Sequence, residues 1–145
     1  MAVASGGGHW VQLLRLREAF DDHQVVFVTV HEHYRDDLEP DDHLEIVPDA
    51  TRWDRIRLVR LALRLLWLIV RHRPHVIVST GAAPGVLALQ LGKLVRARGV
   101  WVDSIANSEV VSMSGQRAGR FADLWLTQWP HLAEPDGPRF EGASV

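Results

Sequence analysis

Ser5-Gly6-Gly7-Gly8-His9 and Ser79-Thr80-Gly81-Ala82-Ala83-Pro84-Gly85 are two glycine-rich turns, each between a short apolar run and an apolar-periodic segment. A strand-to-helix turn without Cβ atoms lets backbone N–H groups converge on a ligand oxygen, and the helix N-terminus adds partial positive charge. We therefore expect both turns to bind one phosphate-bearing ligand. The residues expected to contact it are Ser5, Gly6, Gly7, Gly8, Ser79, Thr80, Gly81 and Ala82.

Strand and helix patterns alternate along the chain around these turns. Expected strands are 1–4, 25–30, 44–47, 75–79, 100–103 and 124–127, and expected helices are 10–20, 52–73, 84–96 and a short one near 115–121. Continuous apolar strands separated by helices predict an α/β fold, a Rossmann-like parallel sheet with helices on both faces. The acidic stretch 32–42 is expected to be a loop, and the tail 133–145 a loop that leads into a final strand. Ligands of such sheets bind beyond the carboxyl ends of the strands, where both glycine turns fall.

Length and composition narrow the class of protein. The 145 residues suffice for one domain over residues 1–145 and are too few for two α/β lobes. The chain has no cysteine, which excludes a disulfide framework and thiolate metal sites. It does not open on a leader pattern, so we expect a cytoplasmic location.

Charge is distributed unevenly although the formal net charge is only -2. Residues 1–51 hold 11 acids and 3 bases, whereas residues 52–73 hold 1 acid and 7 arginines. The uncharged run 65–70 is far shorter than the roughly 20 residues that a spanning helix needs. The segment therefore predicts either a basic helix on an anionic membrane surface or a crossover helix with a solvated edge. Its expected membrane contacts are Arg57, Arg60, Arg64, Trp67 and Arg71.

Five motifs in order along the chain carry a resemblance to a known family. They are Ser5-Gly6-Gly7-Gly8-His9-Trp10-Val11-Gln12-Leu13-Leu14, Ser79-Thr80-Gly81-Ala82, Val102-Asp103-Ser104-Ile105-Ala106, Val111-Ser112-Met113-Ser114-Gly115 and Asp123-Leu124-Trp125-Leu126-Thr127-Gln128-Trp129-Pro130. Together they resemble the acceptor-binding, membrane-recruiting subunit of split UDP-sugar glycosyltransferases. Relatives of that kind act in asparagine-linked glycosylation and in bacterial exopolysaccharide synthesis, and they are similar to the N-terminal lobe of the peptidoglycan lipid-linked N-acetylglucosaminyltransferase.

This resemblance implies a division of labour between two subunits. The chain would equal the N-terminal half of a GT-B glycosyltransferase and hold a polyprenyl-diphosphate-linked sugar acceptor, peripherally, at the cytoplasmic face of a membrane. A UDP-sugar-binding catalytic subunit, for example one that uses UDP-N-acetylglucosamine, would supply the donor. The isolated chain is then expected to have negligible transferase activity, and no cofactor is implied.

Candidate catalytic residues lie beside the expected strand ends. His9, at the first turn of its helix, is expected to accept the proton of the attacking hydroxyl, to bind a phosphate or to cap the turn. Asp103 and Glu109 are the other candidates for proton transfer, and a helix cap or loop carboxylate is an equal alternative for Asp103. The expected acceptor contacts in the later loops are Ser104, Asn107, Ser108, Gln128 and Trp129, with the partner interface as the alternative for the last two.

Other functions have weaker signals. Gly6 to Val11 fits a dinucleotide fingerprint except that Val11 replaces the last glycine, and Glu32 lies where a ribose ligand is expected, so a nicotinamide-dependent oxidoreductase is the enzyme alternative. A recruitment module that only tethers a partner to membranes is the non-enzyme alternative. His31-Glu32-His33 lacks a third spaced ligand, so no metal site is expected. A chain that is acidic overall also argues against nucleic acid as a partner.

Overall fold

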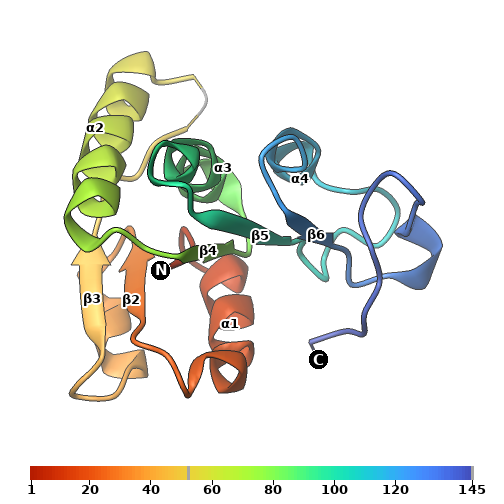
Figure 1. The fold of residues 1–145 in the computed structure, drawn as a ribbon, viewed down its shortest axis with the longest axis horizontal. Coiled ribbons are helices and arrows are strands. Elements are labelled where there is room, and N and C mark those ends of the chain that lie inside the picture. The colour runs from red at the N-terminus through yellow and green to blue at the C-terminus, as the bar shows by residue number, and fades with distance from the viewer. Residues whose placement is uncertain (52, 145) are drawn as a thin grey trace.

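A computed structural model describes residues 1–51 and 53–144. It contains a six-stranded sheet in the order β3-β2-β1-β4-β5-β6, in which every neighbouring pair is parallel (Figure 1). The strands are β1 (Ala2–Val3), β2 (Val26–Thr29), β3 (His43–Ile46), β4 (Val76–Ser79), β5 (Arg98–Val102) and β6 (Leu124–Leu126). The predicted parallel α/β sheet is therefore confirmed.

Within the described residues, four α-helices connect these strands: α1 (Gly8–Arg15), α2 (Arg55–His72), α3 (Ala82–Gly92) and α4 (Met113–Ala118). The same part of the chain contains four short 3-10 helices: η1 (Arg17–Phe20), η2 (Glu32–Asp37), η3 (Lys93–Val95) and η4 (Pro130–Leu132). Two of these correct the predictions, because the first helix tightens into η1 and the acidic stretch contains η2. The tail, predicted to be a loop leading into a final strand that barely begins, forms one isolated parallel bridge between Leu126 and Arg139.

Helices cover both faces of the sheet, as predicted. Figure 1 shows α2, α3 and α4 on one side and α1 on the other. The alternation of side chains along the first strand agrees with this arrangement, because Val3 packs in the cluster with Leu61 and Leu65 of α2, whereas Ala2 and Ala4 pack with Trp10 of α1. All of these side chains are buried.

The arginine-rich helix α2 begins and ends with recognisable caps. Asp54 accepts a hydrogen bond from the Arg57 amide as the N-cap, and Arg73 closes the helix in a left-handed conformation with φ 43°. Arg52, the predicted first residue of this helix, lies outside the described residues. Leu61, Leu65, Leu68 and Ile69 form the buried side of α2. Among the described residues, no helix combines the length and the apolar content that crossing a bilayer requires.

The chain's direction of travel across the sheet reverses between β1 and β4, which are neighbours. Strands β2 and β3 extend to one side of this pair, and β5 and β6 extend to the other. Ligands of doubly wound sheets bind in the crevice at such a switch point, outside the carboxyl ends of the strands. Both glycine turns follow these two strands, so the topology brings them together.

Candidate functional site

The two glycine turns are joined by a pair of hydrogen bonds between His9 and Thr80. The Thr80 hydroxyl donates to the His9 carbonyl at 2.6 Å, and the His9 Nδ1 lies 3.0 Å from the Thr80 carbonyl. Because a carbonyl oxygen only accepts, Nδ1 carries the hydrogen in this contact. In the neutral imidazole, Nε2 then holds the free lone pair. The structure therefore places His9 at the junction of the two turns.

Gly81 is in close contact with the same imidazole. A Cβ on Gly81 would lie 2.1 Å from His9 Nδ1, so a side chain there would displace the ring. The Gly81 amide donates to the Ser79 hydroxyl at 3.3 Å, and both Ser79 and Thr80 are fully buried. The hydroxyls of Ser79 and Thr80 thus hold the turn, and contact of these two residues with a ligand stays a prediction.

The first turn is partly occupied by a tyrosine that the sequence analysis did not single out. The Gly7 amide donates to the Tyr34 hydroxyl at 2.7 Å, and Tyr34 also lies against Gly6. The Gly7 amide is thus already bonded within the chain, and the predicted ligand contacts of this turn fall to its other residues. Tyr34 belongs to η2, which is 27 residues away in sequence, and no local pattern indicates the contact.

Other backbone amides of the turns remain oriented as donors. Gly8 and His9 are the first two residues of α1, and Ala82 and Ala83 are the first two of α3, so their N–H groups have no acceptor one turn earlier within their helices. A Cβ on Gly8 would meet no atom within 4 Å, and Gly8 is exposed. The junction therefore brings the N-termini of α1 and α3 together beside the His9 ring, and helix N-termini favour anions such as phosphate.

Asp103 is enclosed rather than presented to the junction. Its carboxylate accepts hydrogen bonds from Trp101 Nε1 at 3.1 Å, the Ser112 hydroxyl at 2.5 Å, the Ser112 amide at 2.9 Å and Asn107 Nδ2 at 3.4 Å. The residue is 2% exposed, and Gln12 of α1 donates to its carbonyl at 2.9 Å. This geometry favours the loop-carboxylate alternative over proton transfer, because Asp103 fixes both ends of the loop over residues 104–112.

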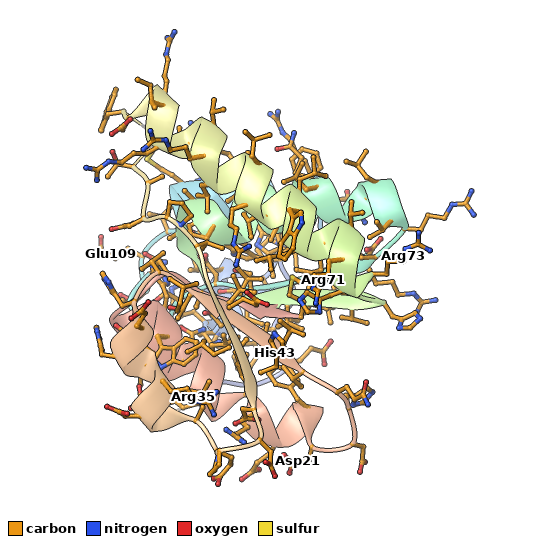
Figure 2. The ribbon with its side chains drawn as sticks, turned by 90° about the vertical axis from the view of Figure 1, so that its left-hand side faces the viewer. Asp21, Arg35, His43, Arg71, Arg73 and Glu109 are labelled. Atoms are coloured by element: carbon orange, nitrogen blue, oxygen red, sulfur yellow. The ribbon has the colours of Figure 1, made fainter. Side chains whose placement is uncertain are left out.

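That loop carries four of the predicted site residues. Ser104 and Asn107 are half-buried, and the Ser104 hydroxyl accepts from the Ala106 amide at 3.3 Å. Ser108 and Glu109 are exposed, and Figure 2 shows Glu109 at the outer edge of the molecule. Ser108 is held through its carbonyl, 2.6 Å from His131 Nε2.

Gln128 and Trp129 stabilise neighbouring segments through their polar atoms. The Gln128 side chain is buried and accepts from the Ser144 amide at 2.8 Å. Trp129 Nε1 donates to the Ile105 carbonyl at 2.9 Å. The amide of Gln128 thus holds the C-terminal tail, and the half-buried Trp129 ring lies beside the 104–112 loop. Contact of either residue with a sugar stays a prediction.

The outer side of α2 combines exposed apolar side chains with arginines. We call this set the outer face of α2, and its apolar members are Ile56, Val59, Leu63, Trp67 and Val70. The Trp67 ring lies between two cations, with the guanidinium carbons of Arg64 and Arg71 at 4.7 and 5.4 Å from its centre.

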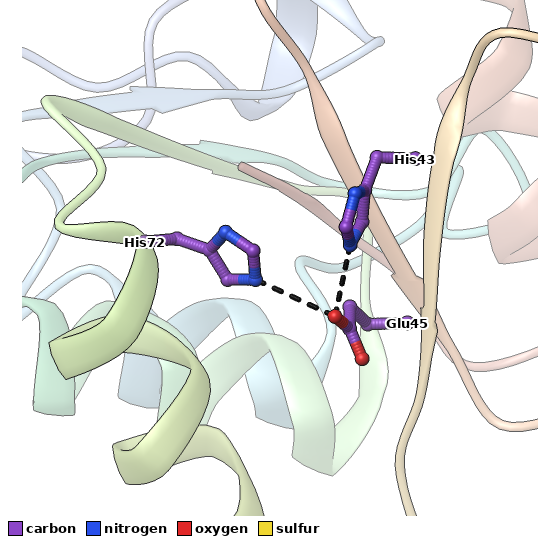
Figure 3. A group of neighbouring side chains, drawn as sticks. All are labelled: His43, Glu45 and His72. Carbon is purple, nitrogen blue, oxygen red and sulfur yellow. Dashed lines mark hydrogen bonds and ion pairs between the residues drawn. The ribbon is translucent and has the colours of Figure 1, made fainter.

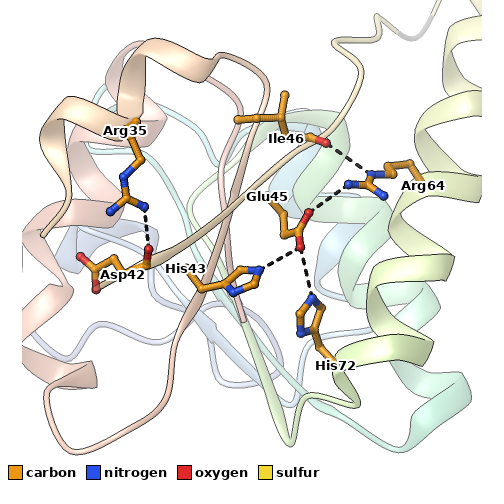
Figure 4. A network of polar contacts seen from close by, with 7 residues as sticks. All are labelled: Arg35, Asp42, His43, Glu45, Ile46, Arg64 and His72. Carbon is orange, nitrogen blue, oxygen red and sulfur yellow. Dashed lines mark hydrogen bonds and ion pairs between the residues drawn. The ribbon is translucent and has the colours of Figure 1, made fainter. Parts of the chain in front are cut away.

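The predicted arginine contacts of α2 differ in their partners. Arg64 donates to Glu45 Oε2 at 2.9 Å and reaches the Ile46 carbonyl at 3.5 Å (Figure 4). Arg57 pairs with Asp54 at 3.1 Å, and Arg60 and Arg71 are exposed.

Burial raises the pKa of Glu45, but the imidazoles of His43 and His72 and the charge of Arg64 outweigh burial and hold that pKa below its ordinary value.

Comparison with known families matches residues 47–142 to the family described as oligosaccharide biosynthesis protein Alg14 like. The chain belongs to this Alg14-like family. Among its relatives, the UDP-N-acetylglucosamine transferase subunit ALG14 of Eremothecium gossypii is 32% identical over 165 residues, which cover 92% of this chain and 74% of that protein. The ALG14 subunit of Mus musculus is 27% identical over 168 residues, which cover 92% of this chain and 76% of that protein.

Solved structures share the fold of this Alg14-like chain. MurG of Acinetobacter baumannii superimposes with a TM-score of 0.74 at 9% identity, over 96% of this chain and 45% of MurG. The UDP-GlcNAc 2-epimerase of Methanocaldococcus jannaschii gives 0.66 at 6% identity, over 87% of this chain and 38% of that enzyme. The chain thus spans less than half of either protein. The predicted likeness to the N-terminal lobe of a GT-B enzyme is confirmed.

Proposed function

We propose that this chain is the acceptor-binding subunit of a UDP-N-acetylglucosamine transferase of oligosaccharide or exopolysaccharide biosynthesis, inactive until a second subunit binds the UDP-sugar. Family membership and the names of its relatives support the reaction class. The names of its relatives, which call them subunits of a transferase, support a heteromer. Family membership also argues against the dinucleotide-dependent oxidoreductase alternative.

One observation carries the acceptor site: the His9–Thr80 hydrogen bonds hold the first turns of α1 and α3 together. Four helix-terminal amides at one junction suit the two phosphates of a polyprenyl-diphosphate-linked sugar. The buried Asp103 supports this site indirectly, because it fixes the loop over residues 104–112 whose Ser104, Asn107 and Ser108 would contact the acceptor sugar.

His9 would act as the general base of the transfer. Its Nε2 accepts the proton of the acceptor hydroxyl as that oxygen forms a bond to the anomeric carbon, and the bond from this carbon to the UDP oxygen breaks. Proton acceptance requires the neutral ring with Nδ1–H donated to Thr80, which the hydrogen bond favours. Phosphate binding through Nε2 would instead need the doubly protonated ring. Glu109, exposed on the loop, is the second candidate for proton transfer.

The outer face of α2 would hold the subunit on the cytoplasmic face of a membrane as a peripheral protein. Five apolar side chains exposed on one side of a basic helix suit insertion at the level of the lipid headgroups. Arg60 and Arg71 would pair with anionic headgroups, and Arg57 would do so after exchanging Asp54 for lipid.

Hydrogen exchange tests the acceptor site directly. Addition of a short-chain polyprenyl-diphosphate sugar should protect the amides of residues 8–9 and 82–83, with no change at the exposed helix η3. The corresponding polyprenol without phosphate is the control and should protect neither turn. Protection confined to α2 would support the recruitment-module alternative and contradict the acceptor site.

A further inference from the structure

Three metal-ligating side chains meet between the edge strand β3 and the last turn of α2. His43 and Glu45 are two residues apart on β3 and so project from the same face, and His72 is the last residue of α2. Glu45 Oε1 lies 2.9 Å from His43 Nε2 and 3.4 Å from His72 Nε2 (Figure 3). The three ligand atoms all lie within 4.8 Å of one another.

The ring of His72 gives further support for a metal site. Its Nε2 is shielded from solvent and, among the described residues, makes no hydrogen bond of good geometry, and its contact with Glu45 Oε1 is a long one of 3.4 Å. A buried ring nitrogen without a hydrogen bond is unfavourable. Coordination of a metal ion by the lone pair of that nitrogen removes this cost.

We propose that His43, Glu45 and His72 bind one Zn²⁺ ion. Two imidazole nitrogens and one carboxylate oxygen are a donor set that zinc takes up readily. Tetrahedral zinc with bonds of about 2.1 Å holds its ligand atoms about 3.4 Å apart. The separation of 3.4 Å to His72 already matches this spacing, and the separation of 2.9 Å to His43 matches it after a small outward movement of an exposed ring. The fourth position would hold water.

Arg64 sets the orientation of the carboxylate in this site. Its guanidinium bonds Glu45 Oε2 at 2.9 Å, which leaves Oε1 turned toward both histidines (Figure 4). Such outer contacts orient ligating carboxylates in metal sites. The positive charge of Arg64 opposes a dication at the same time, so the site is expected to be weaker than one whose carboxylate has no cation beside it.

Bound zinc would join two elements that are distant in sequence. His43 and His72 belong to different elements, so the ion would tie the edge strand to the end of the helix that carries the outer face of α2. Because the unfolded chain does not present this arrangement, zinc binding should raise the midpoint of thermal unfolding.

Zinc titration of the full chain tests the proposal. The tag-free protein, treated with a chelator and dialysed, is titrated with Zn²⁺ by calorimetry and with Co²⁺ by visible absorption. We expect one ion per chain, a higher midpoint of thermal unfolding with Zn²⁺, and a tetrahedral Co²⁺ spectrum. Replacing any ligand, by His43→Ala, Glu45→Gln or His72→Ala, should weaken binding at least tenfold.

Two variants separate the loss of a zinc ligand from a loss of folding and from the loss of any exposed histidine. His43 is exposed, so His43→Ala should leave the fold intact by circular dichroism even where His72→Ala does not. His33→Ala removes an exposed histidine outside the cluster and should bind zinc like the wild type. Absence of binding by the wild-type chain, or equal affinity in His43→Ala and the wild type, overturns the proposal.

Discussion

Gly81 lies so close to the His9 imidazole that its backbone takes the place a side chain would occupy. A Cβ at this position would be 2.1 Å from Nδ1 and 2.3 Å from Cε1 of the ring. The glycine therefore allows the ring to reach the Thr80 carbonyl, and the contact sets which ring nitrogen is free. The backbone of the second turn, at Gly81, thus determines which ring nitrogen of His9 in the first turn is free to accept a proton.

Substitutions of Gly81 and of Gly8 should have different effects on the free energy of unfolding. Gly81→Ala forces the His9 ring from Thr80 and should lower the free energy of unfolding by about 1–3 kcal/mol. Gly8→Ala meets no atom within 4 Å and should leave that free energy unchanged or slightly higher, while raising KM for the acceptor if a phosphate lies there. Urea unfolding and acceptor kinetics of the assembled enzyme check both. Equal stability of the two variants would contradict the contact.

Removal of His9 should lower kcat of the assembled transferase at least tenfold, because a general base is typically worth about 10² to 10⁴ in rate. His9→Gln is the informative partner of His9→Ala, since an amide can donate to a phosphate but cannot accept a proton as a base. Both variants should lose kcat, with assembly intact by gel filtration. Recovery of turnover in His9→Gln would mean that His9 binds phosphate. His23→Ala, in the exposed turn before β2, is the control.

Neutralising Asp103 should destabilise the fold before it affects chemistry. In Asp103→Asn, an amide N–H₂ faces donors that now bond the carboxylate, so a buried donor loses its acceptor. The free energy of unfolding should fall by about 1–3 kcal/mol, and the 104–112 loop should become sensitive to limited proteolysis. Glu109→Gln, on the exposed part of that loop, should change neither property.

A charge on the outer face of α2 should weaken membrane binding. Leu63 is 63% exposed, so Leu63→Glu should fold normally. Loss of a leucine side chain that inserts into the lipid interface is worth about 1.5–3 kcal/mol, which corresponds to about tenfold or more in affinity for anionic vesicles. Leu94→Glu, at a residue of η3 that is 69% exposed, should bind like the wild type. Identical sedimentation of all three proteins with vesicles would refute this surface.

Acid should weaken the contact between η3 and β5 through Asp123. Hydrogen bonds from the Lys93 ammonium and the Gly99 amide hold the pKa of the Asp123 carboxyl below its ordinary value. The folded chain therefore binds this proton less readily than the unfolded chain, so the stabilisation is complete above the ordinary carboxyl pKa of about 3.9 and is lost as pH falls through the lowered value. Asp123→Asn should be less stable than wild type at neutral pH, and urea unfolding should show this difference shrinking in acid.

The sheet was predictable from the sequence because its strands are continuous apolar runs, such as the one that forms β2. The predictions of helix ends were less accurate. Pro84 indicated the start of α3, but the helix begins at Ala82, whose φ is 64°. A positive φ on alanine depends on the surrounding turn, which no local propensity expresses.

The candidate site was also only partly predictable from the sequence. The meeting of His9 with the second turn followed from the glycine pattern and parallel topology. The contacts of Tyr34 with Gly7 and of Gln12 with Asp103 join residues 27 and 91 positions apart, and no sequence spacing indicates them. The cluster of His43, Glu45 and His72 was missed for the same reason, because the end of α2 that carries His72 lies far along the chain from β3.

Arg64 touches two surfaces at once, with its guanidinium on Glu45 and its face over the Trp67 ring. A zinc ion bound to Glu45 would weaken the ion pair between Glu45 and Arg64. A lipid headgroup that binds Arg64 would likewise change the affinity of Glu45 for zinc. Thermodynamic reciprocity makes these two effects equal. Any factor by which zinc alters affinity for a bilayer is the factor by which the bilayer alters affinity for zinc.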